Sequence, residues 1–205
     1  MPLPDFAQLQ AQPDLLLTWL QSNLLISLNP NNNGGGALWM TIVPFVHPIH
    51  GATTGVDTNG NALDVYEIVT AGANAGNGLR CFVCNYVPGQ VHSEVLTAHA
   101  DYCFTAAMNG CTFGISPMAN GQVTVAHANT GGNAVAQRVQ LNGVLPGGLA
   151  AAKVLEPAAY RRVKPNSTLT ATTFGIRTGM KWKFYFQSFE SLGNGAYRTY
   201  GVMPV

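Results

Sequence analysis

The stretch CTFGISPMANGQVTVAHA, residues 111–128, has two runs of alternating apolar residues with PMANG between them. Alternation with a period of two is typical of a β-strand, and Pro followed by Asn-Gly is typical of a turn. The stretch therefore predicts an antiparallel hairpin with a five-residue loop at 117–121. In this register Cys111 lies directly opposite His127, so that the thiol and the imidazole are neighbours on one face.

Runs of the same kind continue on both sides of the hairpin, separated by Gly, Asn and Pro. The other predicted strands are ALWMTIVPF (37–45), LDVYEIVTA (63–71), LRCFVCNYV (79–87), DYCFTAA (101–107), AVAQRVQL (134–141), LTATTFGIR (169–177), KWKFYFQSF (181–189) and YRTYGVM (197–203). A chain with many short strands and few helices predicts an α+β, mainly β fold. We expect a two-sheet antiparallel sandwich flanked by a few helices, with an open barrel as the alternative.

Length and composition predict a single domain that comprises residues 1–205. An N-terminal helix is expected at about 13–24, because Pro and Asp suit its start and an apolar stripe follows. The stripe consists of Leu15, Leu16, Trp19, Leu20 and Leu24. NPNNNGGG at 29–36 is a turn-rich break, after which a β-rich body is expected at 37–205. Within this body PGGLAAAKV (146–154) predicts a short helix.

Charged residues make up 9% of the chain and the net charge is +1, whereas 47% of the residues are hydrophobic. Without a run of Lys or Arg there is no electrostatic surface for nucleic acid or for an anionic membrane, and neither is expected as a partner. The start, MPLPDFAQLQAQPDLLLTWL, lacks the basic segment of a signal peptide. No apolar run approaches the roughly 18 residues of a membrane span. We expect a cytoplasmic protein, or one exported without a cleaved signal.

The cysteines stand at positions 81, 84, 103 and 111 and have three interpretations: a zinc site, a redox CxxC motif and buried free thiols. A redox CxxC motif opens a helix, and no helix is predicted at this point, whereas a disulfide stays open beside the three. Cys81 and Cys84 have the CxxC spacing of a zinc site, and His92 and His99 follow them. However, LRCFVCNYV alternates as a strand, which sends the two sulfur atoms to opposite faces. Buried free thiols are therefore favoured. No metal and no cofactor is predicted.

The pairing of Cys111 with His127 indicates nucleophilic catalysis. A thiol with its ordinary pKa is mostly protonated at neutral pH, and a neighbouring imidazole can accept the proton and stabilise the thiolate. Cys111 is then the nucleophile and His127 the general base. Gly110 removes side-chain bulk beside the sulfur, and amides of the turn that begins at Asn109 are expected to hold an oxyanion.

The segments FTAAMNGCTFGI (104–115) and VTVAHAN (123–129) resemble the catalytic core of the cytotoxic necrotizing factor and Burkholderia lethal factor group. These are bacterial toxins that deamidate glutamine side chains of host proteins. In that group a cysteine after a Leu-Ser-Gly-type turn begins a strand, and a histidine on the neighbouring strand joins it. Here Met108, Asn109 and Gly110 stand in place of Leu-Ser-Gly, so the glycine matches and the two residues before it do not.

The resemblance implies a cysteine-dependent amidohydrolase that converts glutamine to glutamate on a host protein through a thioester, without a cofactor. It also implies that a main-chain carbonyl orients His127, and Thr105 stands at the corresponding position. The resemblance therefore implies a bacterial toxin or effector. Such a protein is expected to stay in the bacterial cytoplasm or to be secreted by a specialised system and act in a host cytosol.

Several alternatives stay open beside this prediction. Asp101 shares a strand face with Thr105 and could orient His127 in place of the carbonyl, and Asn129 has the same strand parity as His127. The same dyad also suits a thiol protease or a transglutaminase. A non-enzymatic β-sandwich binding module is the other class, because the chain is rich in Asn, Gly and Thr and has aromatic residues in KWKFYFQSF.

Overall fold

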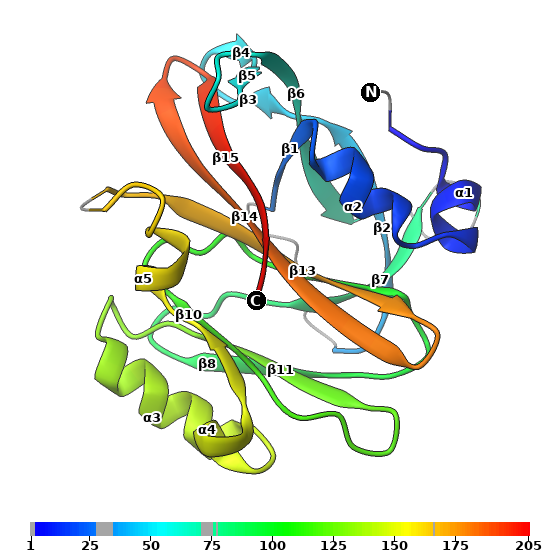
Figure 1. Ribbon diagram of the computed structural model, residues 1–205, viewed down its shortest axis with the longest axis vertical. Helices are drawn as coiled ribbons and strands as arrows, with labels where there is room; N and C mark the ends of the chain where they lie inside the picture. Colours follow the sequence, from blue (N-terminus) through cyan, green and yellow to red (C-terminus); the bar gives the residue numbers. More distant parts are fainter. Residues whose placement is uncertain (1–2, 28–34, 71–75, 77, 166) are drawn as a thin grey trace.

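Strands form most of the regular structure in the computed structural model, which describes residues 3–27, 35–70, 76, 78–165 and 167–205 (Figure 1). The largest sheet contains, in spatial order, β1 (Asn23–Ile26), β6 (Ala62–Thr70), β2 (Leu38–Pro44), β7 (Leu79–Cys84), β9 (Tyr102–Thr105), β13 (Thr170–Thr178), β14 (Lys181–Gly193), β15 (Ala196–Pro204) and β5 (Thr54–Val56). Strand β5 also pairs with β6. Within the described residues, this second pairing joins the two ends of the run of strands from β6 to β5 and closes it into an eight-strand barrel.

The predicted two-sheet antiparallel sandwich is therefore wrong, because the edges of the main sheet meet through β5. At Gly55 in this strand, an added Cβ would lie 2.3 Å from Leu63 Cδ1 and 2.9 Å from Val65 Cγ2, so glycine permits the close approach of β5 to β6. A three-residue strand centred on glycine has no period-two pattern, and the sequence does not reveal the closure. Parallel pairs of β1 with β6, β7 with β9 and β15 with β5 also depart from the expected antiparallel arrangement.

Two short helices, α1 (Phe6–Ala11) and α2 (Leu15–Leu20), replace the single helix predicted at about 13–24. Pro13 lies in the break between them, and residues 23–26 form the buried strand β1 instead of a last helical turn. A fully buried strand has no polar face, so its apolar residues cannot be distinguished from the helical stripe before them. The middle of that stripe is buried as predicted, at Leu16, Trp19 and Leu20.

The helices pack against one face of the barrel wall, and we call the resulting cluster the barrel core. Its members are Leu9, Leu16, Trp19, Leu20, Leu25, Met40, Ile42, Ile68, Leu79, Cys81, Val83, Tyr102, Phe104, Phe174 and Ile176. The Tyr102 hydroxyl donates a hydrogen bond of 2.7 Å to the Leu9 carbonyl, which ties α1 to β9. The barrel core lies on the inner face of the wall, and a second sheet covers the outer face of the same wall.

That second sheet, which we call the small sheet, has the order β12 (Lys153–Leu155), β10 (Thr112–Ile115), β11 (Val123–Ala128) and β8 (Val91–Leu96). It lies against the outer face of the barrel wall, with helix α3 (Ala134–Val144) on its far side (Figure 1). The side chains between the small sheet and the wall form a second buried cluster, which we call the interlayer cluster. It includes Phe82, Cys84, Leu96, Cys103, Cys111, Phe113, Ile115, Leu155, Phe184 and Phe186.

The strand predicted at 134–141 is instead part of α3. Asn133 caps the start of this helix, and Leu141 is fully buried against the small sheet. Val135 and Val139 are 73% and 69% exposed. The valines that suggest a strand therefore face solvent, and the helix packs through other positions.

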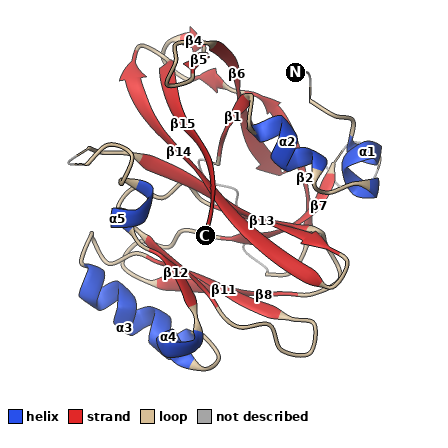
Figure 2. Cartoon of the chain, viewed as in Figure 1, coloured by secondary structure: helices blue, strands red, loops and turns tan. Residues whose placement is uncertain are grey.

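The remaining described elements are α4 (Gly148–Ala151), α5 (Pro157–Tyr160) and the ribbon of β3 (Val46–His47) with β4 (Gly51–Ala52). Helix α4 lies within the short helix predicted at 146–154. The turn-rich break predicted at 29–36 falls mostly outside the described residues. Figure 2 shows how little of the described chain is helical. Among the described helices, none combines the length and the apolar character that crossing a membrane requires.

Candidate functional site

The predicted hairpin forms from β10 and β11, but its register is shifted by two residues. Phe113 lies directly opposite His127, so the predicted direct pairing of Cys111 with His127 is wrong. Because the shift is an even number of residues, the predicted face is right, and both side chains remain on the same side of the small sheet. Cys111 is a diagonal neighbour of His127, with an expected Cβ separation of about 7–8 Å instead of about 5 Å.

The turn explains the shift. Asn120 and Gly121 have φ of 50° and 74°, as a type I′ turn requires, and residues Ala119 and Gln122 exchange backbone hydrogen bonds of 2.9 Å around them. The loop therefore closes on Asn-Gly alone and not on the five residues predicted at 117–121. The residues between this tight turn and the strands then pair irregularly and move the register.

His127 is buried in the interlayer space, 1% exposed, and lies opposite His92 of β8. Within the described residues neither ring nitrogen of His127 has a hydrogen-bond partner, and Nε2 of His92 has none either. Burial, followed by the neighbouring His92, lowers the pKa of His127 to about 4. The imidazole is therefore neutral at pH 7 and can accept a proton. Buried polar atoms without partners are rare in folded proteins and commonly mark a functional or strained position.

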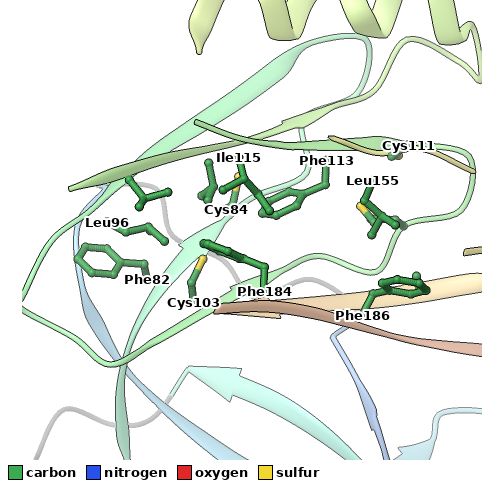
Figure 3. Close-up of a cluster of buried hydrophobic side chains, with 14 of the residues drawn as sticks. Phe82, Cys84, Leu96, Cys103, Cys111, Phe113, Ile115, Leu155, Phe184 and Phe186 are labelled. Carbon is green, nitrogen blue, oxygen red and sulfur yellow. The ribbon is translucent and has the colours of Figure 1, made fainter. Parts of the chain in front are cut away.

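Cys111 precedes β10 and is 3% exposed. It lies at the end of the interlayer cluster near Leu155, away from Phe82 and Leu96 (Figure 3). Burial raises the pKa of its thiol to about 11, and a hydrogen bond from the Asn109 backbone amide partly opposes this rise. The thiol is therefore protonated at neutral pH. It makes no hydrogen bond to His127 in the described part of the chain, because both imidazole nitrogens are without partners there.

Two side chains from distant parts of the sequence hold the turn before Cys111. The Gly110 amide donates a hydrogen bond of 2.7 Å to the Tyr160 hydroxyl, which in turn donates to the Cys111 carbonyl at 3.2 Å. Gln137 Nε2 donates to the Gly110 carbonyl at 2.9 Å. The predicted oxyanion role of the Gly110 amide is therefore wrong for this state, because its proton is already engaged. The Asn109 amide is the one that contacts the sulfur.

A cavity of about 400 Å³ lies beside this turn. Its polar lining includes Asn109, Glu156 and Arg161. The Arg161 guanidinium donates to Asn109 Oδ1 at 3.0 Å, and Glu156 forms an ion pair with Arg138 at 2.5 Å. The cavity is large enough for a side chain with a carboxamide group, and it offers both donors and acceptors to such a group.

The structure places Thr105 and Asp101 apart from the imidazole. Thr105 lies in β9 of the barrel wall, where its hydroxyl donates to the Thr173 carbonyl at 3.4 Å. Since neither nitrogen of His127 has a partner in the described residues, the Thr105 carbonyl does not orient the ring in this state. Asp101 forms an ion pair of 2.7 Å with Arg177, and among the described residues its carboxylate is not a hydrogen-bond partner of either His127 nitrogen.

Asn129 is the candidate that the register brings closest to the thiol. The last pair of the hairpin is Thr112 with Ala128, and continuing it by one residue on each strand sets Asn129 opposite Cys111. Asn129 is 9% exposed, and its backbone amide donates to the Gln90 carbonyl at 3.1 Å. Its side-chain amide is therefore better placed than Thr105 or Asp101 to act beside the sulfur.

The other cysteines occupy two separate clusters. Cys81 belongs to the barrel core and Cys84 to the interlayer cluster, as the alternation of their strand predicts. All the cysteines are free thiols and buried. Burial, followed by the nearby Glu94 carboxylate, raises the pKa of Cys84 well above its ordinary value. In the part of the chain that the structure describes, no three His, Cys, Asp or Glu side chains are arranged to hold a metal ion.

Three residues around the site were not found from the sequence: Tyr160, Gln137 and His92. Tyr160 is far from Gly110 along the chain, and no local pattern links the two. Gln137 lies in the segment that resembles a strand and forms α3. His92 lies in β8, where polar residues at buried positions obscure the alternation of apolar and polar residues. The spacing of His92, Glu94 and Leu96, which share one face of this strand, is the signal that could have identified it.

No protein-family model matches the sequence, and no curated protein matches it either.

Proposed function

We propose that this chain is a cysteine-dependent amidohydrolase that deamidates glutamine side chains of a target protein. The observation that carries the proposal is the placement of Cys111 and His127 on one face of neighbouring strands, both buried, with the imidazole nitrogens unpartnered in the described structure. The resemblance of the surrounding residues to glutamine-deamidating toxins supplies the reaction and the substrate class.

Catalysis requires the two side chains to turn toward each other, because they start as diagonal neighbours. An aromatic side chain can reach a diagonal partner across an antiparallel pair. In the resting state the thiol is protonated and the imidazole is neutral, but the raised pKa of Cys111 and the lowered pKa of His127 oppose proton transfer between them. The proposed closed state therefore has to bring the two pKa values together, as contact between the imidazolium and the thiolate does. In the proposed closed state His127 contacts the Cys111 thiol beside Phe113.

In the proposed reaction the Cys111 sulfur attacks the carboxamide carbon of the substrate glutamine, and its proton passes to His127. The Asn109 amide, which contacts the sulfur in the resting state, donates to the oxyanion once the sulfur has attacked, and Asn129 is the candidate that positions the imidazole or the substrate. The C–N bond breaks as His127 returns the proton to the departing ammonia, which leaves a thioester. Water then attacks the thioester with His127 as base, so that glutamate and the free thiol are formed.

The proposed partner is a glutamine-bearing host protein, and by the same resemblance the chain acts in a host cytosol after export by a specialised system. Transglutamination uses the same thioester with an amine in place of water, and a thiol protease uses the same dyad on a peptide bond. These reactions are distinguished by their products: glutamate, a new isopeptide bond or a shortened chain.

A non-enzymatic binding module is the second candidate. It is supported by the raised pKa of the Cys111 thiol and by the absence of a hydrogen bond between the thiol and His127 in the described structure. A protein with no use for a nucleophile would keep the thiol protonated and buried in this way.

The first experiment measures the rate of alkylation by iodoacetamide as a function of pH, with peptide mapping of the labelled cysteine. The proposal predicts that Cys111 reacts faster than Cys81, Cys84 and Cys103 below about pH 8, and that His127→Gln removes this advantage. The His99→Gln variant is the matched control, because His99 is exposed and lies outside the site.

Two results separate the candidate functions. If Cys111 labelling rises only toward pH 11 and is the same in both variants, the imidazole does not activate the thiol and the binding module is favoured. If the labelling is selective, incubation with a mammalian cytosolic extract follows, and glutamine-to-glutamate conversion is mapped by mass spectrometry. Cys111→Ser is the inactive control for that step.

A further inference from the structure

A cavity of about 540 Å³ lies between the small sheet and β14. It is lined by Ile115 and the residues that follow it, whereas Cys111 precedes the other end of the same strand. The site proposed for catalysis and this cavity therefore occupy opposite ends of the interlayer cluster. Nothing in the proposed deamidation uses the cavity.

The walls of the cavity are apolar and aromatic. Ile115 and Val123 line it from the small sheet, and Trp182 and Phe184 line it from β14. The two aromatic rings are stacked, with centroids 6.1 Å apart and planes inclined at 22°. Met118, in the turn region above the cavity, is 48% exposed although its side chain is apolar. The cavity thus offers an apolar surface for a chain or ring of comparable size.

Three of the four lysines of the sequence line this cavity: Lys153, Lys181 and Lys183. Lys153 pairs with Ile115 and shares a strand face with Leu155, so its side chain leaves toward the interlayer space. The other two, Lys181 and Lys183, alternate with Trp182 along β14, so their side chains leave from the opposite face of that strand at the edge of the cavity that they line. All three lysines are exposed.

No acidic residue of the described chain lines the cavity, and none forms an ion pair with these three lysines. The fourth lysine, Lys164, is paired with Glu190 at 2.6 Å. In a chain with 9% charged residues, three lysines without an ion-pair partner among the described residues line one apolar cavity, which Val205, the last residue of the sequence, also lines. The side chains around the cavity therefore carry a local excess of positive charge.

We propose that this cavity binds an amphipathic anion, with an apolar chain between the two layers and a single carboxylate head group at the lysines. The apolar walls account for the chain, the lysine excess accounts for the head group, and the volume lies in the usual range of small-molecule sites. Lys153 is the residue that contacts the head group from the small sheet. A fatty acid is the simplest ligand of this kind.

Calorimetric titration with dodecanoate, below its micelle concentration, tests the proposal. Methyl dodecanoate and dodecyltrimethylammonium carry the same chain with a neutral or a cationic head. We expect saturable binding of dodecanoate, and binding of the other two that is weaker by roughly ten-fold or more. Equal binding of the three would mean an apolar cavity without a head-group site, and it would overturn the proposal.

Variants locate the binding. Lys153→Gln should raise the Kd for dodecanoate roughly two- to five-fold, and the double variant Lys181→Gln, Lys183→Gln should act in the same direction. Arg162→Gln removes one exposed positive charge outside the cavity and should leave the Kd unchanged. A thermal melt of each variant confirms that it is folded. An unchanged Kd in Lys153→Gln, or no binding to the folded wild-type protein, contradicts the proposal.

Cys111→Ser separates this site from the proposed catalysis. The variant should bind dodecanoate with unchanged affinity, because the thiol and the cavity lie at opposite ends of the interlayer cluster. A loss of binding in Cys111→Ser would place the ligand at the thiol and overturn the assignment to the lysine-flanked cavity.

Discussion

The two faces of the barrel wall differ in what they bury. The inner face, in the barrel core, meets α1 and α2 and consists mainly of Leu, Ile, Val and aromatic side chains, with the Cys81 thiol and the Tyr102 hydroxyl as its titratable groups. The outer face and the small sheet enclose groups that can exchange protons: Cys84, His92, Glu94, Cys103, Cys111 and His127. Both faces belong to the same strands, because alternate residues of a strand point to opposite sides.

The difference separates the sources of stability and of chemistry. Apolar burial on the inner face stabilises the barrel roughly in proportion to the area removed from water. Titratable groups on the outer face are costly to bury and are retained where they have a use. Truncations inside the barrel should therefore change stability alone, whereas changes in the interlayer space should also change pH dependence or thiol reactivity.

The largest effect is expected from Trp19→Ala in α2. Trp19 is fully buried in the barrel core, and its loss leaves a cavity, so the free energy of unfolding should fall by about 4 kcal/mol. Urea denaturation measures the change, and the labelling rate of Cys111 should stay constant in the folded protein. Val139→Ala, at an exposed position of α3, is the control and should change stability little. A faster labelling of Cys111 in Trp19→Ala would break the separation between the two faces.

The pH dependence of stability tests the outer face. The pKa of His127 is lowered to about 4 in the folded protein from an ordinary value of 6.5. The stabilisation that comes with the neutral imidazole is complete above pH 6.5 and is lost as the pH falls through about 4, because only the unfolded chain takes up the proton between these values. The wild type should lose about 3 kcal/mol more than His127→Gln between pH 7 and pH 4. Parallel curves for the two proteins in urea denaturation at each pH would show that His127 is not buried as described.

A smaller effect is expected from Tyr160→Phe. The hydroxyl links the Gly110 amide and the Cys111 carbonyl, and its removal leaves both backbone groups without this partner, at a cost of about 2 kcal/mol. Tyr200→Phe removes a hydroxyl that donates to Glu190 at a partly buried position and should cost less than about 1 kcal/mol. Thermal unfolding of the two variants gives the comparison. Equal losses of stability in the two variants would mean that the hydrogen bonds of Tyr160 to the turn before Cys111 contribute no more than a hydrogen bond near the protein surface.

The smallest effect is expected from Gly110→Ala. The φ of +92° at Gly110 is strained for any residue with a Cβ, and the nearest atom to an added Cβ is Arg161 Nη2 at an ordinary 3.8 Å. The cost is therefore in the backbone alone, about 1–2 kcal/mol. Gly143→Ala in α3 has open space and should stabilise the protein by about 0.5–1 kcal/mol. Changes of the same sign in both glycines, measured by urea denaturation, would contradict this account of the turn.

Local patterns predicted the strands around the site but not their register. Alternation in CTFGIS and QVTVAHA places Cys111 and His127 on one face, and the structure confirms that face. The loop length decides which residues are opposite, and Asn120 with Gly121 closes a tighter turn than the predicted one. A difference of two residues at the turn preserves the face and changes every pair, so a dyad of direct neighbours becomes a diagonal one.

The sequence by itself determined that strands dominate and that their faces alternate. These properties are carried by residues within a few positions of one another. The tertiary structure alone decided that β5 closes a barrel, that α3 replaces a strand, and that Tyr160 holds the turn before Cys111. Each of these depends on contacts between residues far apart in the chain, and such contacts are selected by packing of the whole fold and leave no local pattern.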